Sequence, residues 1–458
     1  MRVLFVLLIT LLLTNSVIAQ HTMKFKPLRY DEDYSSLAGD TLRSEYEKIK
    51  FIPLSKNRES YISFGGEARF QYFYLNNEDW GDTDQDKDGY TLSRYLFHMD
   101  FHVGKRFRLF SQLQSSMVNS RMAASPVEEN PLEMHQAFVD FNPVISEREN
   151  LTVRIGRQEL SYGSQRLVSV REAPNNRQAF DAARAIYILG STKTEVFYGH
   201  YVQAGKGIFD DKFMGENTRL WGAYFTQSRL PFIKNADLYY FGLSKRNAKF
   251  NDGAGKEIRH SLGTRIFSAE NDWKYDAEAL YQFGYIGGKN ISAWTASVNT
   301  SYRFSATPLK PEIGLKAELI SGDLHKEDRS VETFNPLFPK GAYFGLAALI
   351  GPSNLMDLHP SASFELSPKL SFDVDFDVFW RYSKNDGIYA VNMTMIYPDG
   401  DSREKHIGDQ LTGTLYYTPN KFLNLRWELT WFRAGNYLKE VGSGKDILYT
   451  GVTVQFKF

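Results

Sequence analysis

The sequence predicts an all-β protein, a transmembrane antiparallel β-barrel of about 18 strands and of the outer-membrane type. Three observations predict this fold. Apolar and polar residues alternate with period two over runs of about 10–14 residues, the length of a tilted bilayer crossing rather than of an ordinary strand. The apolar faces of these runs end in aromatic residues, as interface girdles do. The connections between the runs are alternately short and long.

Length and composition agree with a large closed barrel. The 458 residues would make roughly two or three soluble domains, but one closed β structure can be this large. There are 54 basic and 54 acidic residues, so the net charge of zero gives no reason to expect a nucleic acid as partner. The chain has no cysteine, which excludes a disulfide scaffold, a cysteine-ligated metal site and thiol catalysis.

The first 60 residues precede the barrel. Residues 1–19 are predicted to be a secretory signal peptide, with a basic start at Arg2, an apolar run too short to span a bilayer stably, and cleavage after Ala19. Residues 20–60 show no alternation and are interpreted as a short periplasmic N-terminal arm with one or two helical turns. A small plug is the alternative interpretation of this arm. The barrel is assigned to residues 61–458.

The first strand shows the pattern that later strands repeat. From Ile62 to Tyr74, apolar side chains alternate with polar ones such as Ser63, Glu67 and Arg69. The same alternation recurs in three later runs, at residues 312–319, 371–380 and 423–431. The aromatic residues at the ends of the apolar faces include Tyr72, Tyr74, Tyr416, Tyr417, Trp427 and Trp431.

The connections predict the orientation of the barrel, because outer-membrane barrels have short periplasmic turns and long outer loops. Short turns are expected near residues 104–106, 190–191, 269–270, 367–368 and 418–419. Long loops are expected at 75–89, 118–131, 161–175, 204–217, 246–256, 323–342, 383–405 and 435–447. The strand pattern is weakest at 341–366, where Gly351-Pro352 interrupts it.

The last predicted strand, residues 447–458, alternates up to the terminal Phe458. A terminal aromatic strand without a tail suits closure against the first strand, which leaves no unpaired backbone edge in lipid. Outer-membrane proteins commonly carry such a strand as a signal to the barrel assembly machinery, which is therefore an expected partner.

If the apolar faces meet lipid, the opposite residues line the lumen. By alternation these include Glu67, Arg69, Arg94, Asp100, Arg259, Arg265, Asp276, Glu278, Lys316, Glu318, Asp373, Asp375, Asp377, Arg426 and Glu428. A guanidinium is always charged and presents a planar fork that matches a carboxylate, so a ladder of arginines would let a polyanion exchange partners as it slides. The alternative is that these charges pair with one another and stiffen a polar interior.

The segment from Leu151 to Ala185 concentrates six arginines and three acids: Arg154, Arg157, Arg166, Arg171, Arg177, Arg184, Glu159, Glu172 and Asp181. Its alternation, continued past Ile155, would turn Arg157 and Glu159 towards lipid, where a mid-bilayer charge costs about 2–4 kcal/mol. Either a bulge at Gly156 reverses the faces, or these residues lie beyond the membrane edge. Residues 162–176 are therefore expected to fold into the mouth and to carry arginines to the constriction.

Several motifs resemble the alginate export family. They are Gly156-Arg157-Gln158-Glu159-Leu160, Tyr162-Gly163-Ser164-Gln165-Arg166-Leu167, Asn176-Arg177, Phe180-Asp181, Gly65-Gly66-Glu67-Ala68-Arg69 and the late run from Thr333 to Pro339. The resemblance covers most of the chain after the signal segment. It implies an outer-membrane barrel of 18 strands whose arginine-rich constriction passes an anionic polyuronate. The expected substrate path is Arg69, Glu67, Arg157, Glu159, Arg166, Arg177, Asp181, Arg184, Arg259, Arg265 and Arg426.

Residues 82–89 form an acidic loop that contains the first half of a calcium-binding pattern. Asp84, Asp86 and Asp88 alternate before Gly89, which would suit a hard cation. The twelfth position is Tyr95 instead of a bidentate Glu. Calcium binding is one expectation for this loop, and a merely solvated acidic loop is the other. No cofactor is expected apart from this possible Ca²⁺.

The sequence shows only weak signs of a zinc site or of a catalytic site. His98 and His102 share a face of a predicted strand but show no zinc-protein spacing, so they are interpreted as polar lumen residues. His359-Pro360-Ser361 and His406 with Asp409 are the only clusters that suggest a barrel hydrolase, and neither has a specific signature.

The sequence as a whole predicts a non-enzymatic, passive channel in the outer membrane of a Gram-negative-type bacterium. Its expected partners are outer-membrane lipid and an anionic oligo- or polysaccharide such as alginate or another uronate. A general diffusion porin or a structural barrel is the first alternative, and an outer-membrane barrel enzyme is the second.

Overall fold

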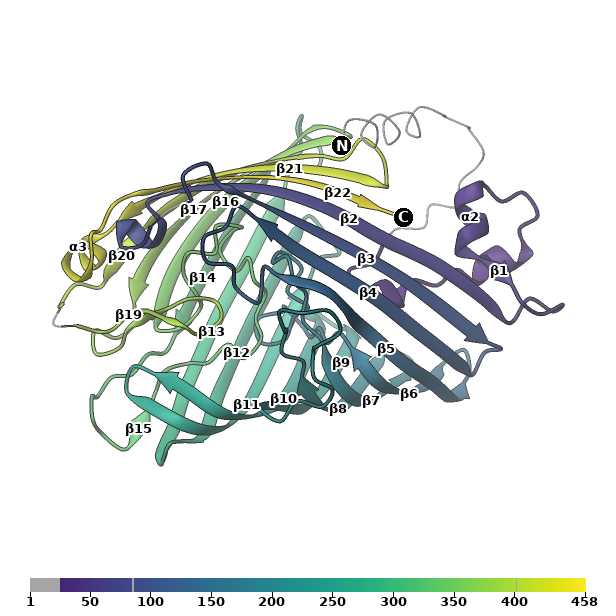
Figure 1. Cartoon of the computed structure of the whole chain (residues 1–458), viewed down its shortest axis with the longest axis horizontal. Coiled ribbons are helices and arrows are strands. Elements are labelled where there is room, and N and C mark those ends of the chain that lie inside the picture. Colours follow the sequence, from purple (N-terminus) through teal and green to yellow (C-terminus); the bar gives the residue numbers. More distant parts are fainter. Residues whose placement is uncertain (1–24, 85, 401) are drawn as a thin grey trace.

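The computed structural model describes residues 25–84, 86–400 and 402–458, so the signal segment at 1–19 lies outside the described residues. The described chain is a closed antiparallel barrel of 18 long strands (Figure 1). They are β2 Tyr61–Asn76, β3 Tyr90–Val103, β4 Phe107–Asn119, β5 Asn130–Ile145, β6 Glu149–Gln158, β7 Phe180–Leu189, β8 Thr192–Tyr201, β9 Thr218–Leu230, β10 Lys234–Phe250, β11 Gly253–Ser268, β12 Trp273–Ile286, β13 Lys289–Arg303, β14 Glu312–Ile320, β16 Leu355–Ser367, β17 Leu370–Arg381, β20 His406–Tyr417, β21 Leu423–Ala434 and β22 Ile447–Lys457.

Each barrel strand pairs with the barrel strands before and after it along the chain, and β22 closes the cylinder against β2. The closing register runs from Glu67 opposite Lys457 to Asn76 opposite Leu448. The predicted fold class, the strand number and the closure by the last strand are therefore confirmed. Closure matters because an unpaired strand edge in lipid leaves backbone groups without hydrogen-bond partners.

The alternation of the sequence appears as two faces of the wall. On β2, Phe70 is 49% exposed on the outside, whereas Glu67 and Arg69 are buried inside. On β21, Trp427 and Trp431 are exposed in the same way. The aromatic and apolar faces therefore point outwards, and the charged faces form the interior of the barrel.

The shorter elements lie at the two ends of the barrel and within its loops (Figure 1). They are β1 Ile52–Pro53, β15 Ser330–Val331, β18 Ile388–Tyr389, β19 Met395–Tyr397, the 3-10 helices η1 Arg29–Asp31, η2 Ser35–Gly39 and η3 Glu78–Gly81, and the helices α2 Glu45–Lys50 and α3 Asn436–Val441. The α2 helix begins with a capping box between Ser44 and Glu47. Among the described helices, none has the length and apolar character needed to cross a membrane.

One predicted loop is wrong. Residues 246–256 were expected to form a long loop, but β10 and β11 extend through this region and leave only residues 251 and 252 between them. The extended hairpin packs Ala248 and Phe250 against Val331 and Tyr389. Other loops cover this apolar side of the hairpin, whereas its polar residues, such as Arg246 and Lys249, are exposed.

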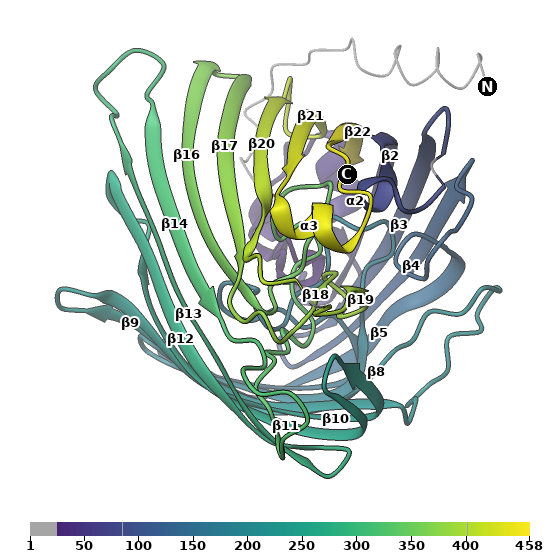
Figure 2. The same cartoon turned by 90° about the vertical axis from the view of Figure 1, so that its left-hand side faces the viewer.

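Two long loops turn inwards. They are residues 159–179, between β6 and β7, and residues 321–354, between β14 and β16. The second loop includes the weak region of the sequence pattern, since β16 begins only at Leu355. The two loops meet in a parallel bridge between Val168 and Phe338. Figure 2 shows the end of the barrel that carries the long connections, with β18, β19 and α3 lying across the opening.

The N-terminal arm has an outer part and a lumenal part. The α2 helix and β1 lie at the end of the barrel opposite α3 (Figure 1). Tyr30, by contrast, packs edge-on against Phe110 and Phe138, which are buried on β4 and β5. The part of the arm around Tyr30 therefore packs against the inner wall of the barrel.

Candidate functional site

The loop at residues 159–179 crosses the lumen and is fixed to the wall of β2 and β3. Arg69 on β2 donates to the backbone carbonyls of Glu172 and Pro174 at 2.7 and 2.8 Å. Arg94 on β3 lies 2.8 Å from the Glu172 carboxylate, measured from Nη2 to Oε1. These two wall arginines hold the tip of the loop by its backbone and by one acid.

Arg166 holds the same loop to another part of the wall. Its Nε lies 3.3 Å from Glu278 on β12, and its Nη2 contacts Ser297 on β13 and Glu318 on β14. The loop thus spans the interior from β2 and β3 to β12–β14. Residues 162–176 lie inside the barrel, as the alternation of the sequence indicated.

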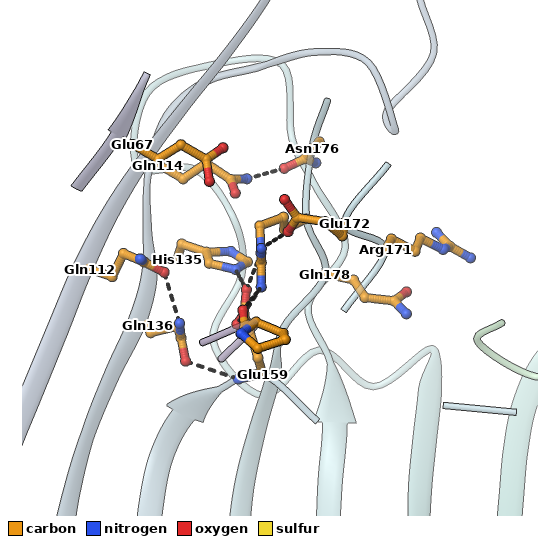
Figure 3. Close-up of polar contacts among 12 residues, drawn as sticks. Glu67, Gln112, Gln114, His135, Gln136, Glu159, Arg171, Glu172, Asn176 and Gln178 are labelled. Atoms are coloured by element: carbon orange, nitrogen blue, oxygen red, sulfur yellow. Dashed lines mark hydrogen bonds and ion pairs between the residues drawn. The ribbon is translucent and has the colours of Figure 1, made fainter. Parts of the chain in front are cut away.

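Arg177 is buried and contacts two acids of the same loop. Its Nε is 2.5 Å from Glu159 Oε1, and its Nη1 contacts the Glu172 carboxylate. His135 Nε2 is 2.8 Å from the same Glu159 oxygen. Figure 3 shows Gln136, whose side chain accepts a hydrogen bond from the Glu159 backbone nitrogen at 3.2 Å.

Gly156 hosts no bulge, so the alternation continues through it and Arg157 shares the face of Ile155. The ladders to β5 and β7 both keep their register through this residue. Its φ is +134°, a conformation that side-chain-bearing residues rarely adopt. Ile155 is 60% exposed, whereas Arg157 is buried and pairs with Asp181, Nε to Oδ1, at 2.8 Å. The loop at residues 202–217 covers Arg157 through two backbone carbonyls.

The other residues of the predicted path also lie inside and also have partners. The pairs are Glu67 with Arg94, Arg184 with Glu195, Arg259 with Glu257, Arg265 with Asp237 and Asp276, and Arg426 with Glu428. The arginines of this path therefore donate to carboxylates or to backbone carbonyls. All of them are paired in this structure, and their part in guiding an anion stays a prediction.

Arg171 is different, and the sequence analysis did not place it in the path. Within the described ranges, its guanidinium has neither an ion pair nor a hydrogen-bond partner, although only 9% of the residue is exposed. Figure 3 shows its side chain extending away from Glu172. It lines a cavity of about 80 Å³ together with Asn176, Arg177 and Gln178. Strand alternation could not have found Arg171, because it lies in a loop.

The N-terminal arm reaches Glu159 and Arg177 from the other end of the barrel. The Tyr30 hydroxyl donates to the Glu159 carbonyl at 2.9 Å, and Arg177 donates to the Pro27 carbonyl at 3.2 Å. Arg29 donates to the carbonyl of the terminal Phe458 at 2.9 Å. The arm is thus tied both to the constriction loop and to the closing strand, a contact that residue patterns gave no means of predicting.

The acidic loop at residues 82–89 is held by protein groups. Asp86 accepts hydrogen bonds from the Arg121 guanidinium at 2.7 Å and from the Met122 backbone nitrogen at 2.8 Å. Asp82 contacts the Tyr397 hydroxyl and the Ser443 backbone nitrogen. Calcium binding by Asp84, Asp86 and Asp88 stays a prediction, and it requires the ion to compete with Arg121.

The histidines singled out in the sequence line the interior. His98 stacks on Phe110, and His102 stacks on Tyr61 while its Nε2 lies 3.1 Å from Asp100 Oδ1. In the cluster considered for a hydrolase, His406 Nε2 is 3.0 Å from Asp409 Oδ1, and Asp409 also pairs with Arg433.

Residues 60–446 match the family model described as alginate export. No curated protein sequence matches the chain. Among solved structures, OccK3 (OpdO) of Pseudomonas aeruginosa has a TM-score of 0.57 at 10% identity, over 87% of this chain and 95% of that one. OccK2 (OpdF) of the same organism, solved in complex with glucuronate, has a TM-score of 0.55 at 11% identity, over 87% and 96%. OccAB1 of Acinetobacter baumannii gives 0.56 at 12%, over 90% and 100%. At these identities the likeness shows a shared outer-membrane barrel fold.

Proposed function

The chain belongs to the alginate export family, and we propose that it is a passive outer-membrane channel for anionic saccharides such as alginate or other uronates. Arg171 carries this proposal. Its guanidinium has no counter-ion among the described residues, and Arg171 lines the same cavity as Arg177. A guanidinium fork matches a carboxylate in geometry and in charge, so a uronate carboxylate is a suitable ligand.

The paired arginines have a different part in this proposal. Arg166 and Arg177 keep the inserted loop in place through their acids, and Arg157 pairs with Asp181 under the loop at residues 202–217. Their compensated charges would attract an anion only weakly, which suits conduction because a permeating molecule must also leave each site. The glucuronate complex of OccK2 supports the same ligand class on a similar fold. The family and the fold point to a transporter rather than to an enzyme.

Single-channel recording in planar bilayers tests the role of Arg171. We expect uronate oligomers to interrupt the current of the wild-type channel, and the Arg171→Gln variant to lose most of this block. Arg433→Gln is the matched control, because Arg433 is a more exposed arginine that pairs with Asp409 outside the constriction. Neutral oligosaccharides of equal length should interrupt the current less in every variant.

Two outcomes would contradict this proposal. Equal block by charged and neutral oligosaccharides would indicate a general diffusion porin. Equal uronate block in wild type and Arg171→Gln would remove Arg171 from the substrate path.

A further inference from the structure

We propose that the lumen wall formed by β14, β16 and β17 carries a binding site for a divalent transition-metal cation, with Asp357, His359 and Asp377 as its ligands. One ligand atom from each of these three residues lies within 4.8 Å of the other two. This set is separate from the acidic loop at residues 82–89 and from the Arg171 cavity. It therefore adds a second binding site to the lumen, beyond the proposed passage of saccharides.

The strand register places the three side chains on one inward-facing patch. Asp357 and His359 are two residues apart on β16, and the pairing of β16 with β17 puts His359 opposite Asp377. Leu358, between the first two, is 41% exposed on the outer face, so its neighbours point inwards. Because all three ligands lie on paired strands, the wall holds their spacing before an ion binds.

Asp357 provides an independent indication of a ligand. It is 4% exposed, and neither of its carboxylate oxygens has a hydrogen-bond partner in the part of the chain that the structure describes. The residue opposite it on β14 is Glu318, another acid. A buried carboxylate without a partner, next to a second acid, is costly, and a bound cation would remove that cost.

The contact between His359 and Asp377 points the same way. His359 Nδ1 lies 2.6 Å from Asp377 Oδ1, yet neither atom takes part in a hydrogen bond. Two donor atoms this close without hydrogen-bond geometry fit ligands that share one ion. His359 Nε2 lies 3.2 Å from Asp375, which can fix the ring orientation from the second side, as outer carboxylates do for metal-bound histidines.

The charges around the three ligands favour the binding of a divalent cation. Glu318 is compensated by Arg166 and by Lys316, whose Nζ lies 2.9 Å from Glu318 Oε2. With these three groups paired, Asp357 and Asp377 supply two negative charges around a neutral imidazole. Imidazole nitrogen with carboxylate oxygen suits Zn²⁺ or Mn²⁺, whereas Ca²⁺ and Mg²⁺ prefer oxygen alone. Three protein ligands also leave a coordination position for water or for a passing carboxylate.

Calorimetric titration of the metal-stripped full-length barrel in detergent micelles with ZnCl₂ tests the site. We expect one Zn²⁺ per chain, and at least tenfold weaker binding by Asp357→Asn and by His359→Gln. His102→Gln is the matched control, because His102 also faces the lumen next to an acid, Asp100, but lies outside the cluster. This control should bind Zn²⁺ as the wild type does.

A variant with the opposite effect separates loss of ligands from misfolding. Lys316→Gln removes a positive charge beside the site and should tighten Zn²⁺ binding several-fold, which a damaged barrel would not do. The inference is overturned if the wild type takes up no Zn²⁺ at millimolar concentration. It is also overturned if all variants bind equally, which would leave His359 as an imidazolium held between Asp375 and Asp377.

Discussion

Gly156 shows how the close pairing of two strands can depend on one residue. A Cβ atom at this position would lie 2.2 Å from the backbone oxygen of Ala137 on β5, far inside contact distance. The φ of +134° adds strain for any residue other than glycine. Ile155 and Arg157 share one face of β6, and Arg157 is buried because the loop at residues 202–217 covers it.

We predict that Gly156→Ala destabilises the barrel by about 1–3 kcal/mol, the usual scale for a residue forced into a sparsely populated conformation. The urea midpoint of unfolding in micelles measures this change. Gly104→Ala is the control, because Gly104 also has a positive φ, +58°, but a Cβ there meets nothing within 4 Å. Equal losses in the two variants would show that crowding against Ala137 does not matter.

Asp323, in the inward loop after β14, is expected to make that loop sensitive to pH. Burial, together with the negative charge of the neighbouring Asp386, raises its pKa to about 7. Between about pH 4 and pH 7 the folded loop keeps this proton, whereas an open loop loses it. The docked loop is therefore most stable at low pH, and its stability falls as the pH rises to about 7.

Hydrogen exchange of the amides in residues 321–335, corrected for intrinsic rates, measures this effect between pH 5 and pH 8. Protection should fall with rising pH in the wild type and stay nearly constant in Asp323→Asn. Asp328→Asn is the control, because hydrogen bonds from Ser330 lower the pKa of Asp328, which lies in the same loop. A pH profile unchanged by Asp323→Asn would exclude this carboxyl as the cause.

At the scale of elements, the N-terminal arm and the β6–β7 loop meet inside the barrel. Tyr30 donates to the Glu159 carbonyl, its own backbone carbonyl accepts from Arg108 at 2.6 Å, and the Arg154 guanidinium lies 4.1 Å from its ring. These contacts come from three different strands or loops. An arm held in this way narrows the lumen next to Arg177.

We predict that deleting residues 25–34 raises single-channel conductance several-fold, because it removes the lumenal part of the arm. The point variant Tyr30→Ala should give a smaller increase, with more frequent open events. Ser36→Ala is the control, since Ser36 is exposed in η2. Unchanged conductance after the deletion would show that ions pass elsewhere in the lumen.

At the scale of the whole molecule, the seam between β2 and β22 also anchors the arm. The backbone nitrogen of Gly66 donates to the Phe458 oxygen at 2.9 Å, and Phe458 donates back at 3.0 Å. Arg29 donates to the carbonyls of both residues. The last residue of the chain thus completes the cylinder and holds the arm at the same point.

Removing Phe458 is therefore expected to have two effects. It should slow the closure of the barrel, and it should weaken the attachment of the N-terminal arm to the barrel. Heat-modifiable mobility on gels measures the folded fraction, and protease sensitivity of residues 25–34 measures the arm. Lys457→Gln is the control, because it keeps the terminal ring and its backbone contacts. A truncated chain with normal folding and a protected arm would contradict this double role of Phe458.

The strands and their inward and outward faces were predictable because lipid admits only apolar side chains. The outward-facing residues in the middle of β2 and β21 are therefore apolar or aromatic, as Phe70 and Trp427 are. Loop positions were harder to predict. The six arginines of the 151–185 segment look equivalent in the sequence, yet only the fold separates Arg171 from the five that meet carboxylates. Likewise, polar residues at 246–256 suggested a loop, since the sequence does not show where the membrane ends.

The amino-acid order thus specified the membrane barrel, its 18 strands and its closure at Phe458, since period-two alternation and strand length are local properties. The side-chain contacts inside the lumen depend on the tertiary structure. The partners of Arg166, at Glu278 and Glu318, are more than a hundred residues away along the chain. The same is true of Tyr30 and Glu159, and residue spacing cannot encode such contacts. Charge pairing across a closed cylinder depends on which strands face each other, which only the closed barrel fixes.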